Sequence, residues 1–338
     1  NVLSAPVGGT YLNTGMISLQ ANPTDNLSGI QQVAFYAGYD DGSGWKWHEL
    51  GFDNDGSNGW GLTWNVSQVP DQTWVDFISF AWDKAWNGAT TSAWNITLDR
   101  QPPVTVFQPL EAVQNSTKVY LRWTAVDAVS GLDHFDIQMQ RDGGAWQDWQ
   151  TNLSSATTSA RFYGDMGHQY SFRIRGVDKA GNAESYLGKP EISFTISTCT
   201  GDSYELDNTI ALAKPITANE LQPHTICGQG DGSWTGDLDW VKLPVEAGIS
   251  YMLMTTQLGE TTDTVLALYD ADGNKLAEND DIVDGVDLAS RIFWTAPQSG
   301  FVYLRVRHFD NRVAGSGVTY TLWPAVVYYY YYLPVVIR

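Results

Sequence analysis

The stretch "KVYLRWTAVDAVSGLDHFDIQ" (Lys118–Gln138) contains the pattern that decides the fold of this 338-residue chain. Its first nine residues alternate between apolar and polar side chains, which is typical of a strand with one buried face. The same alternation occurs in "QYSFRIRGV" (Gln169–Val177) and in "FVYLRVRHF" (Phe301–Phe309). Clusters of Gly, Asp and Asn separate such runs, and almost no segment shows the longer period of a helix. The sequence therefore predicts an all-β protein.

Composition narrows the range of functions. The chain has 15 Trp and 17 Tyr, and only 17% of its residues are charged, a balance that favours β-structure. Its length is sufficient for two or three domains, each with its own core. The formal net charge of −19 argues against nucleic acid as a partner, because nucleic-acid binding requires a basic surface.

The second half of the opening stretch belongs to an internal repeat. "VDAVSGLDHFDIQ" (Val126–Gln138) matches "TDNLSGIQQVAFY" (Thr24–Tyr36) through an Asp, a Ser-Gly pair and an aliphatic residue. Further along each copy, "FAWDKAWNGA" (Phe80–Ala89) matches "RGVDKAGNAE" (Arg175–Glu184). We expect two copies of one module, residues 1–101 and 102–197, separated at the proline-containing linker "DRQPP" (Asp99–Pro103).

These two repeated motifs, which we call marks, resemble those of bacterial immunoglobulin-like and fibronectin-III-like modules. Such modules stand in tandem on secreted and surface proteins. The D-x-x-S-G-(I/L) mark occurs at Asp25–Ile30 and Asp127–Leu132, and the D-x-A-G-N mark at Asp178–Asn182. In the first copy Trp86 replaces the glycine of the second mark. The resemblance implies two β-sandwiches with both marked turns at one end. The turn carboxylates either cap loop amides or together bind a cation, and the sequence leaves both interpretations open.

Five motifs after the repeat indicate a third domain over residues 198–325. Their order resembles the bacterial pre-peptidase C-terminal domain, a jelly-roll sandwich similar to the collagen-binding domains of bacterial collagenases. The motifs are "CTGDSYELDNTIALA" (Cys199–Ala213), "GDLDWVKLPVEAGISY" (Gly236–Tyr251), "LALYDADGNKLAENDD" (Leu266–Asp281), "TAPQSGFVYLRV" (Thr295–Val306) and "YTLWP" (Tyr320–Pro324).

This resemblance implies a calcium site where an acidic stretch meets a later Asp-x-Asp. The implied ligands are Glu205, Asp207, Asp237 and Asp239, with Asn208 as a further candidate. Hard carboxylate oxygens suit calcium, and without a cation their mutual repulsion requires protonation. The alternative is that these residues only begin a strand on an acidic surface.

A second candidate metal site comprises Asp280, Asp281 and Asp284, which follow a "DADGN" hairpin without the spacing of an EF-hand.

The cysteines and histidines offer no catalytic site. Cys199 and Cys227 are too few and too isolated for a zinc site, so we expect one disulfide, which favours an exported protein. The histidines stand singly, and no nucleophile or metalloprotease motif occurs, so we expect no enzyme activity.

Three tryptophan pairs include spacings that would place both rings on one face of a strand. They either stack on a glycan or pack as part of the fold, and their recurrence in both modules favours packing. The pairs are Trp45 and Trp47, Trp60 and Trp64, and Trp146 and Trp149.

The chain ends in "AVVYYYYYLPVVIR" (Ala325–Arg338). A transmembrane helix needs about 20 apolar residues, and Pro324 and Pro334 interrupt this stretch. Because "YTLWP" matches the closing strand of the third domain, residues 326–338 are expected to lie beyond that domain. Such a strand can pair with the sheet edge of another copy. The expected interface residues are Tyr328, Tyr329, Tyr330, Tyr331, Tyr332, Leu333, Val335, Val336 and Ile337.

The sequence thus predicts three consecutive β-sandwiches, two Ig-like and one jelly roll, followed by a C-terminal extension strand. We expect a non-catalytic, extracellular, cell-surface protein that binds calcium but neither nucleic acid nor a membrane. The leading hypothesis is a subunit of a bacterial surface filament, joined to other copies head to tail by strand donation. The alternative is a set of secreted modules, from a larger hydrolase or surface protein, that binds an extracellular protein or polysaccharide.

Overall fold

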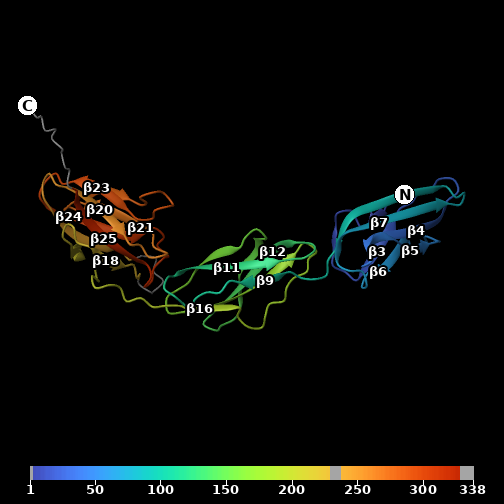
Figure 1. Cartoon of the computed structure of the whole chain (residues 1–338), viewed down its shortest axis with the longest axis horizontal. Coiled ribbons are helices and arrows are strands. Elements are labelled where there is room, and N and C mark those ends of the chain that lie inside the picture. Colours follow the sequence, from blue (N-terminus) through green and yellow to red (C-terminus); the bar gives the residue numbers. More distant parts are fainter. Residues whose placement is uncertain (1–2, 229–236, 328–338) are drawn as a thin grey trace, which may run out of the picture.

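The computed structural model describes residues 3–228 and 237–327, and it confirms an all-β fold. These residues form strands β1 to β25 and one short 3-10 helix, η1 (Ile210–Leu212). Figure 1 shows them arranged as three β-sandwiches in a row, which we call the first module (β1–β8), the second module (β9–β16) and the third domain (η1 and β17–β25).

The first module packs a three-stranded sheet on a five-stranded sheet. Its core lies between them and includes the fully buried Leu19, Phe35, Phe77 and Ile96. The first sheet has the order β1 (Leu3–Ala5), β3 (Met16–Ala21) and β6 (Trp60–Asn65). The second has the order β2 (Tyr11–Leu12), β8 (Gly88–Leu98), β7 (Gln72–Asp83), β4 (Ile30–Asp40) and β5 (Trp45–Asp53).

The second module repeats this plan around Trp123, which is buried against Phe107 and Phe135. Val119 and Leu121 are buried on the same strand as Trp123, while Tyr120 between them is exposed, as the period-two pattern predicts. One sheet has the order β14 (Ser159–Tyr163), β11 (Lys118–Val126) and β9 (Val104–Phe107). The other has the order β10 (Val113–Gln114), β16 (Ile192–Ile196), β15 (Gln169–Asp178), β12 (Leu132–Arg141) and β13 (Gln147–Ser154).

The repeat is visible in the hydrogen bonds of the marked turns. In the first module Lys84 N donates to Gly29 O, and in the second Lys179 N donates to Gly131 O, both at 3.0 Å. Each bond ties one mark to the other, so both marks lie at the same end of their sandwich, as expected.

The third domain packs a five-stranded sheet on a four-stranded one, with Val241, Leu253, Leu304 and Leu322 fully buried between them. The first sheet has the order β17 (Lys214–Pro215), β19 (Asp239–Val245), β24 (Gly300–His308), β21 (Thr264–Tyr269) and β22 (Lys275–Asn279). The second has the order β18 (Gln222–Thr225), β25 (Thr319–Val327), β20 (Ser250–Thr256) and β23 (Arg291–Thr295).

The closing strand extends further than the sequence suggested. We expected it to end at Pro324, but β25 continues to Val327. A proline is tolerated there because β18 pairs only as far as Leu322, so Pro324 needs no ladder donor on that side. Asn219 takes the place of the missing strand: its N–H donates to Pro324 O, and its side-chain oxygen accepts from Val326 N. Tyr328–Arg338, the segment expected to form a subunit interface, lies outside the described residues.

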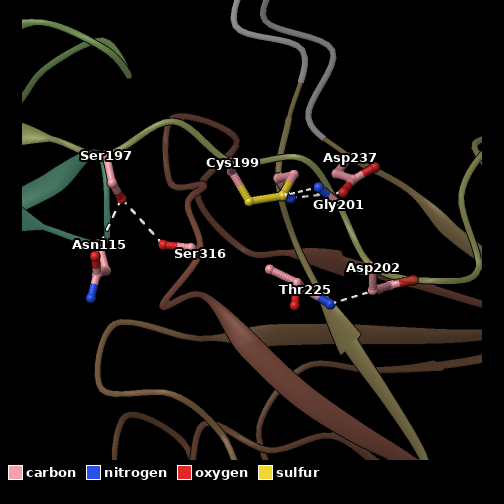
Figure 2. Close-up of a disulfide and its surroundings, with 9 residues drawn as sticks. Asn115, Ser197, Cys199, Gly201, Asp202, Thr225, Asp237 and Ser316 are labelled. Atoms are coloured by element: carbon pink, nitrogen blue, oxygen red, sulfur yellow. Dashed lines mark hydrogen bonds between the residues drawn. A yellow bond between two sulfur atoms is a disulfide. The ribbon is translucent and has the colours of Figure 1, made fainter.

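Two junctions connect the three sandwiches. At the second junction, between the second module and the third domain, Thr117 N donates to Ala314 O (2.9 Å) and Gly317 N donates to Asn115 O (2.8 Å). The Thr117 hydroxyl donates to Arg312 O and accepts from Ala314 N. The side chain of Asn115 also contacts Ser197 at this seam (Figure 2).

Candidate metal centre

A disulfide positions an acidic segment beside the first strands of the third domain. The bond joins Cys199 to Cys227, with 5.5 Å between their Cα atoms. Gly201 N donates to Cys227 Sγ, and Thr225 N donates to Asp202 Oδ2, both at 2.8 Å (Figure 2). These contacts hold residues 199–208 against the end of β18.

The four expected carboxylates meet at this point. Asp239 is the first residue of β19, and Asp237 precedes it by two positions, so the strand directs both toward the acidic segment. Carboxylate oxygens of Glu205, Asp237 and Asp239 lie within 4.8 Å of one another. Asp207 and Asp239 form a second such group with His224, so that Asp239 belongs to both. We call these four acidic residues and His224 the acidic cluster.

Asp207 is the residue in the acidic cluster whose surroundings point most clearly to a ligand. Its exposed fraction is 1%, and neither carboxylate oxygen has a hydrogen-bond partner. Its neighbours are engaged: Asp239 accepts from the Tyr320 hydroxyl, and Asp237 accepts from Cys227 N at 2.8 Å. A buried carboxylate with no donor is costly, and a cation removes that cost.

The protonation of the acidic cluster reflects this crowding. Burial, with added repulsion from Glu205, raises the pKa of Asp207 to about 7. Burial and the charge of Asp237 raise the pKa of Glu205 to about 7. Burial, followed by the charge of Asp237, also raises the pKa of Asp239 well above its ordinary value. Without a cation, the acidic cluster therefore retains protons near neutral pH.

His224 was not anticipated from the sequence. It lies on β18, buried, with its ring stacked on Tyr320 at 5.1 Å between centroids. Its Nδ1 lies 3.5 Å from Asp202 Oδ2 and 3.9 Å from Asp239 Oδ2. The imidazole there offers a nitrogen ligand. A single histidine between polar residues gave no signal in the sequence.

Asn208, the further candidate ligand, makes a hydrogen bond to the chain just before β19. Its side-chain oxygen accepts a hydrogen bond from Leu238 N at 2.8 Å, between the two aspartates of the Asp-x-Asp motif. It thereby ties the acidic segment to the start of β19.

The second candidate site contains Asp263 in place of Asp284. Oxygens of Asp263, Asp280 and Asp281 lie within 4.8 Å of one another, whereas Asp284 is exposed and outside the group. One oxygen each of Asp263 and Asp280 is buried without a partner. Burial, and then the charge of Asp280, raises the pKa of Asp263 to about 6. Asp263 precedes β21 and is remote in sequence from the other two, which is why the sequence did not reveal it.

The tryptophans divide between packing and exposure. Trp60, Trp64 and Trp149 pack against the module cores, as favoured above. Trp146 stacks on the Arg173 guanidinium at 4.3 Å. Trp45 and Trp47 contradict the packing interpretation, because they are exposed on β5, Trp45 by 46%. Trp45 lies over Gly38 and Trp47 lies beside Trp94, on the face of the five-stranded sheet that is turned away from the core.

Comparison with known proteins assigns the first module. A family model described as a bacterial Ig domain matches residues 2–74. The first module is therefore similar to bacterial Ig domains, as its sequence marks predicted. No protein among those with curated descriptions matches the chain.

Similar solved structures extend over the other sandwiches. One is the pre-peptidase C-terminal domain of a collagenase from Bacillus anthracis, at 19% identity, covering 33% of this chain and 93% of that one, with a TM-score of 0.26. Another, described as a Ca2+-stabilized adhesin that helps an Antarctic bacterium bind ice, has 10% identity, covers 96% of this chain and 72% of that one, and has a TM-score of 0.30. The FN1–FN3 domains of chicken CNTN1 have 12% identity and cover 59% of this chain and 68% of that one, with a TM-score of 0.29. Values this low concern the fold alone and carry no argument about ligands.

Within residues 3–228 and 237–327, no helix has the length and apolar character needed to cross a bilayer.

Proposed function

We propose that this protein is a non-catalytic, extracellular structural protein whose third domain binds calcium through Glu205, Asp207, Asp237 and Asp239. The observation that carries the proposal is the buried Asp207, whose two oxygens have no hydrogen-bond donor and which lies in one group with Asp239 and His224. Calcium accepts six to eight hard oxygens at adaptable geometry, which suits converging carboxylates better than any transition metal does.

In this proposal the ion fastens the chain where it enters the third domain. Glu205 and Asp207 belong to the segment that leads in from the second module, whereas Asp237 lies just before β19 and Asp239 is its first residue. A cation between them adds to the disulfide a second link from that segment to the sandwich. Because the unfolded chain has no such site, calcium at about 1,000 times its Kd would stabilise the fold by about 4 kcal/mol.

The test compares the melting temperature and the number of bound calcium ions for the parent chain and for Asp207→Asn. Asparagine keeps the size of the side chain and removes its charge. We expect calcium to raise the Tm of the third domain in the parent, and Asp207→Asn to lose one calcium equivalent. Asp284→Asn, an exposed carboxylate of the same domain outside both groups, is the matched control and should bind as the parent does. A parent whose Tm is the same in calcium and in chelator would contradict the proposal.

We further propose that the tail joins copies into a filament. The path of the chain supports this idea, because β25 is an inner strand between β18 and β20. A chain leaving from an inner strand cannot extend its own sheet by running straight on, whereas β18 and β23 each leave an edge unpaired within their sheet. Strand addition to the edge of another copy would form a head-to-tail contact, which generates an open fibre.

The filament is tested by electron microscopy of purified full-length protein in calcium. We expect filaments, and we expect deletion of Tyr328–Arg338 to leave monomers with an unchanged Tm. Full-length protein that remains monomeric at high concentration rejects the filament but not the calcium site.

A second candidate function, adhesion, is favoured by the outer face of the first module. Trp45 lies on Gly38, where an added Cβ would approach the indole to 2.3 Å, and its Nε1 donates to Trp74 O at 3.2 Å. Trp47 and Trp94 continue the aromatic surface, with 6.0 Å between their ring centroids. Exposed apolar patches of this kind mark interaction sites, and ordered aromatic rings can stack on sugars.

Adhesion is tested by binding to immobilised polysaccharides. We expect Trp47→Ala to weaken retention, while Trp86→Ala, an exposed tryptophan in a turn at the edge of the sheet, leaves it unchanged. If both variants and the parent are retained equally, this face does not bind the polysaccharide.

A further inference from the structure

We propose that a calcium ion also binds at the first junction, between the two Ig-like modules, at Asp99, Asp127 and Asp178. Oxygens of these three residues lie within 4.8 Å of one another. Asp99 follows β8 of the first module, whereas Asp127 follows β11 and Asp178 ends β15 of the second. This junction site is therefore complete only when both modules are present, and it is separate from the acidic cluster of the third domain.

Within the described residues the junction site has no counter-charge, and two of its carboxylates, Asp99 and Asp178, are buried while Asp127 is half-buried. The exposed fractions of Asp99 and Asp178 are 1% and 2%. The neighbouring Arg100 is engaged elsewhere, because its Nε donates to Asp71 Oδ1 at 2.7 Å and its other nitrogens donate to carbonyl oxygens. No lysine, arginine or histidine in the described ranges forms an ion pair with any of the three carboxylates. Converging carboxylates without a counter-charge offer the hard oxygen ligands that calcium prefers.

Ser130 supplies an independent sign of a ligand. Its exposed fraction is 6%, its amide donates to Asp99 Oδ2 at 2.9 Å, and its hydroxyl oxygen is buried without a partner. In the first module the equivalent Ser28 hydroxyl donates to Asp25 Oδ2 at 3.3 Å. The equivalent hydroxyl is bound to a turn carboxylate in the first module, whereas the buried Ser130 hydroxyl has no partner and is available to a cation.

The two modules differ at this end in one essential residue. Asp25 and Asp83 of the first module correspond to Asp127 and Asp178, but no third carboxylate joins them in the part of the chain that the structure describes. Asp99 completes the set in the second module, and Asn182 also crosses the junction, donating to Asp99 O at 2.9 Å. An ion held by both modules would fix their relative orientation, so calcium would set the stiffness of this half of the rod.

The test uses Asp127→Asn in the full-length chain. A single oxygen of Asp127 accepts from both Val129 N and Gly131 N, so asparagine can keep the loop while removing one charge from the site. Asp25→Asn is the matched control, since Asp25 accepts from the equivalent Leu27 N and Gly29 N. Calcium is titrated calorimetrically into chelator-treated protein, and the distance between spin labels across the first junction is measured with and without calcium.

We expect Asp127→Asn to lose one calcium equivalent or to weaken that equivalent about tenfold or more, as removal of groups at a metal site does. Asp25→Asn should bind as the parent does. In the parent, chelation should broaden the distance distribution across the first junction. The third-domain variant Asp207→Asn should retain the calcium equivalent of the junction site, so the two proposed sites can be rejected independently of each other. Unchanged calcium binding by Asp127→Asn, or a junction distance that ignores calcium in the parent, would overturn the proposal.

Discussion

The first junction is built from buried carboxylates, whereas the second junction is built from neutral and paired groups. At the second, Arg312 lies over the Tyr163 ring at 3.9 Å and forms an ion pair with Asp310 at 2.8 Å, while Tyr163 donates to the same aspartate. The charges of Arg312 and Asp310 are thus paired with each other. At the first, three carboxylates converge, and within the described residues none of them forms an ion pair. The second junction is therefore held by contacts within the protein, whereas the first, in our proposal, needs a cation from the solution.

The largest effect is expected from Gly315→Ala at the second junction. Gly315 has φ +142°, and an added Cβ would lie 2.4 Å from Asn115 O across the seam. Backbone on both sides leaves little room to adjust, so we expect a loss of about 1–3 kcal/mol and a broadened distance distribution across the second junction. Gly300→Ala is the control, because Gly300 has a similar φ of +156° and nothing within 4 Å of an added Cβ. Equal destabilisation by both variants would assign the effect to backbone strain alone.

A smaller effect is expected from Arg312→Ala. The variant removes both the ring contact with Tyr163 and the ion pair with Asp310, a loss of about 1 kcal/mol at a partly exposed site. Denaturant unfolding measures the change, with Arg122→Ala as the control because Arg122 approaches only the Tyr120 ring, at 5.9 Å. If the second junction is complete without an ion, the effect of Arg312→Ala should be the same in calcium and in chelator.

The pH dependence should separate the second junction from the acidic cluster. Hydrogen bonding from Arg312 holds the pKa of Asp310 well below its usual range. A lowered pKa stabilises the fold above the unfolded value of about 4, and this contribution is lost as the pH falls further. The second junction should therefore loosen only below about pH 4, and Asp310→Asn should abolish that transition. Label distances across the junction, measured as a function of pH, report it.

The raised pKa values of Glu205 and Asp207 predict the opposite sign. In chelator and between about pH 4 and pH 7, these groups are ionised in the unfolded chain but still protonated in the folded chain. The Tm of the third domain should therefore rise as the pH falls from about 8 to about 5. Saturating calcium should remove this rise, because the ion stabilises the ionised form. A Tm with the same pH dependence in calcium and chelator would contradict the assignment.

The smallest effect is expected from Trp86→Gly, which tests the turns that the two modules share. Trp86 has φ +64° where the second module has Gly181 at +86°, and Trp86 is exposed. Relief of the left-handed strain should stabilise the first module by about 0.5–1 kcal/mol, after the greater entropy of glycine in the unfolded chain is subtracted. Gly181→Trp should destabilise the first junction, because Gly181 faces Asn13 of the first module. Thermal unfolding of both variants checks the pair.

Local periodicity explains why much of the fold could be predicted. Strands such as β11 and β24 alternate buried and exposed residues along their length, and this alternation can be read without knowing their partners. The repeat was visible because the two marked turns use the same hydrogen bonds in both copies. The end of β25 could not be read, because the tolerance of Pro324 depends on where a distant strand, β18, stops pairing.

The same distinction applies to the sites. Glu205 with Asp207, and Asp237 with Asp239, stand in short motifs, so their residue types and order suggested a common function. Asp99, His224 and Asp263 each stand alone in sequence and join their clusters only through tertiary packing. For Asp99 the sequence contains one weak indication of a role at the junction, which is its position at the very end of the first module. Trp45 is exposed because it lies on the outer face of its sheet, and alternation along β5 alone does not tell which of the two faces meets the core.

The inner position of β25 has a mechanical consequence. Thr321–Val327 pair with β20 on one side, and Thr319–Leu322 pair with β18 on the other. A force applied to the chain beyond Val327 acts along these ladders, so many hydrogen bonds share the force at the same time. A strand peeled from an edge would instead lose its hydrogen bonds one after another. The third domain is thus connected in shear to whatever its C-terminal segment holds, which is the geometry that resists pulling best.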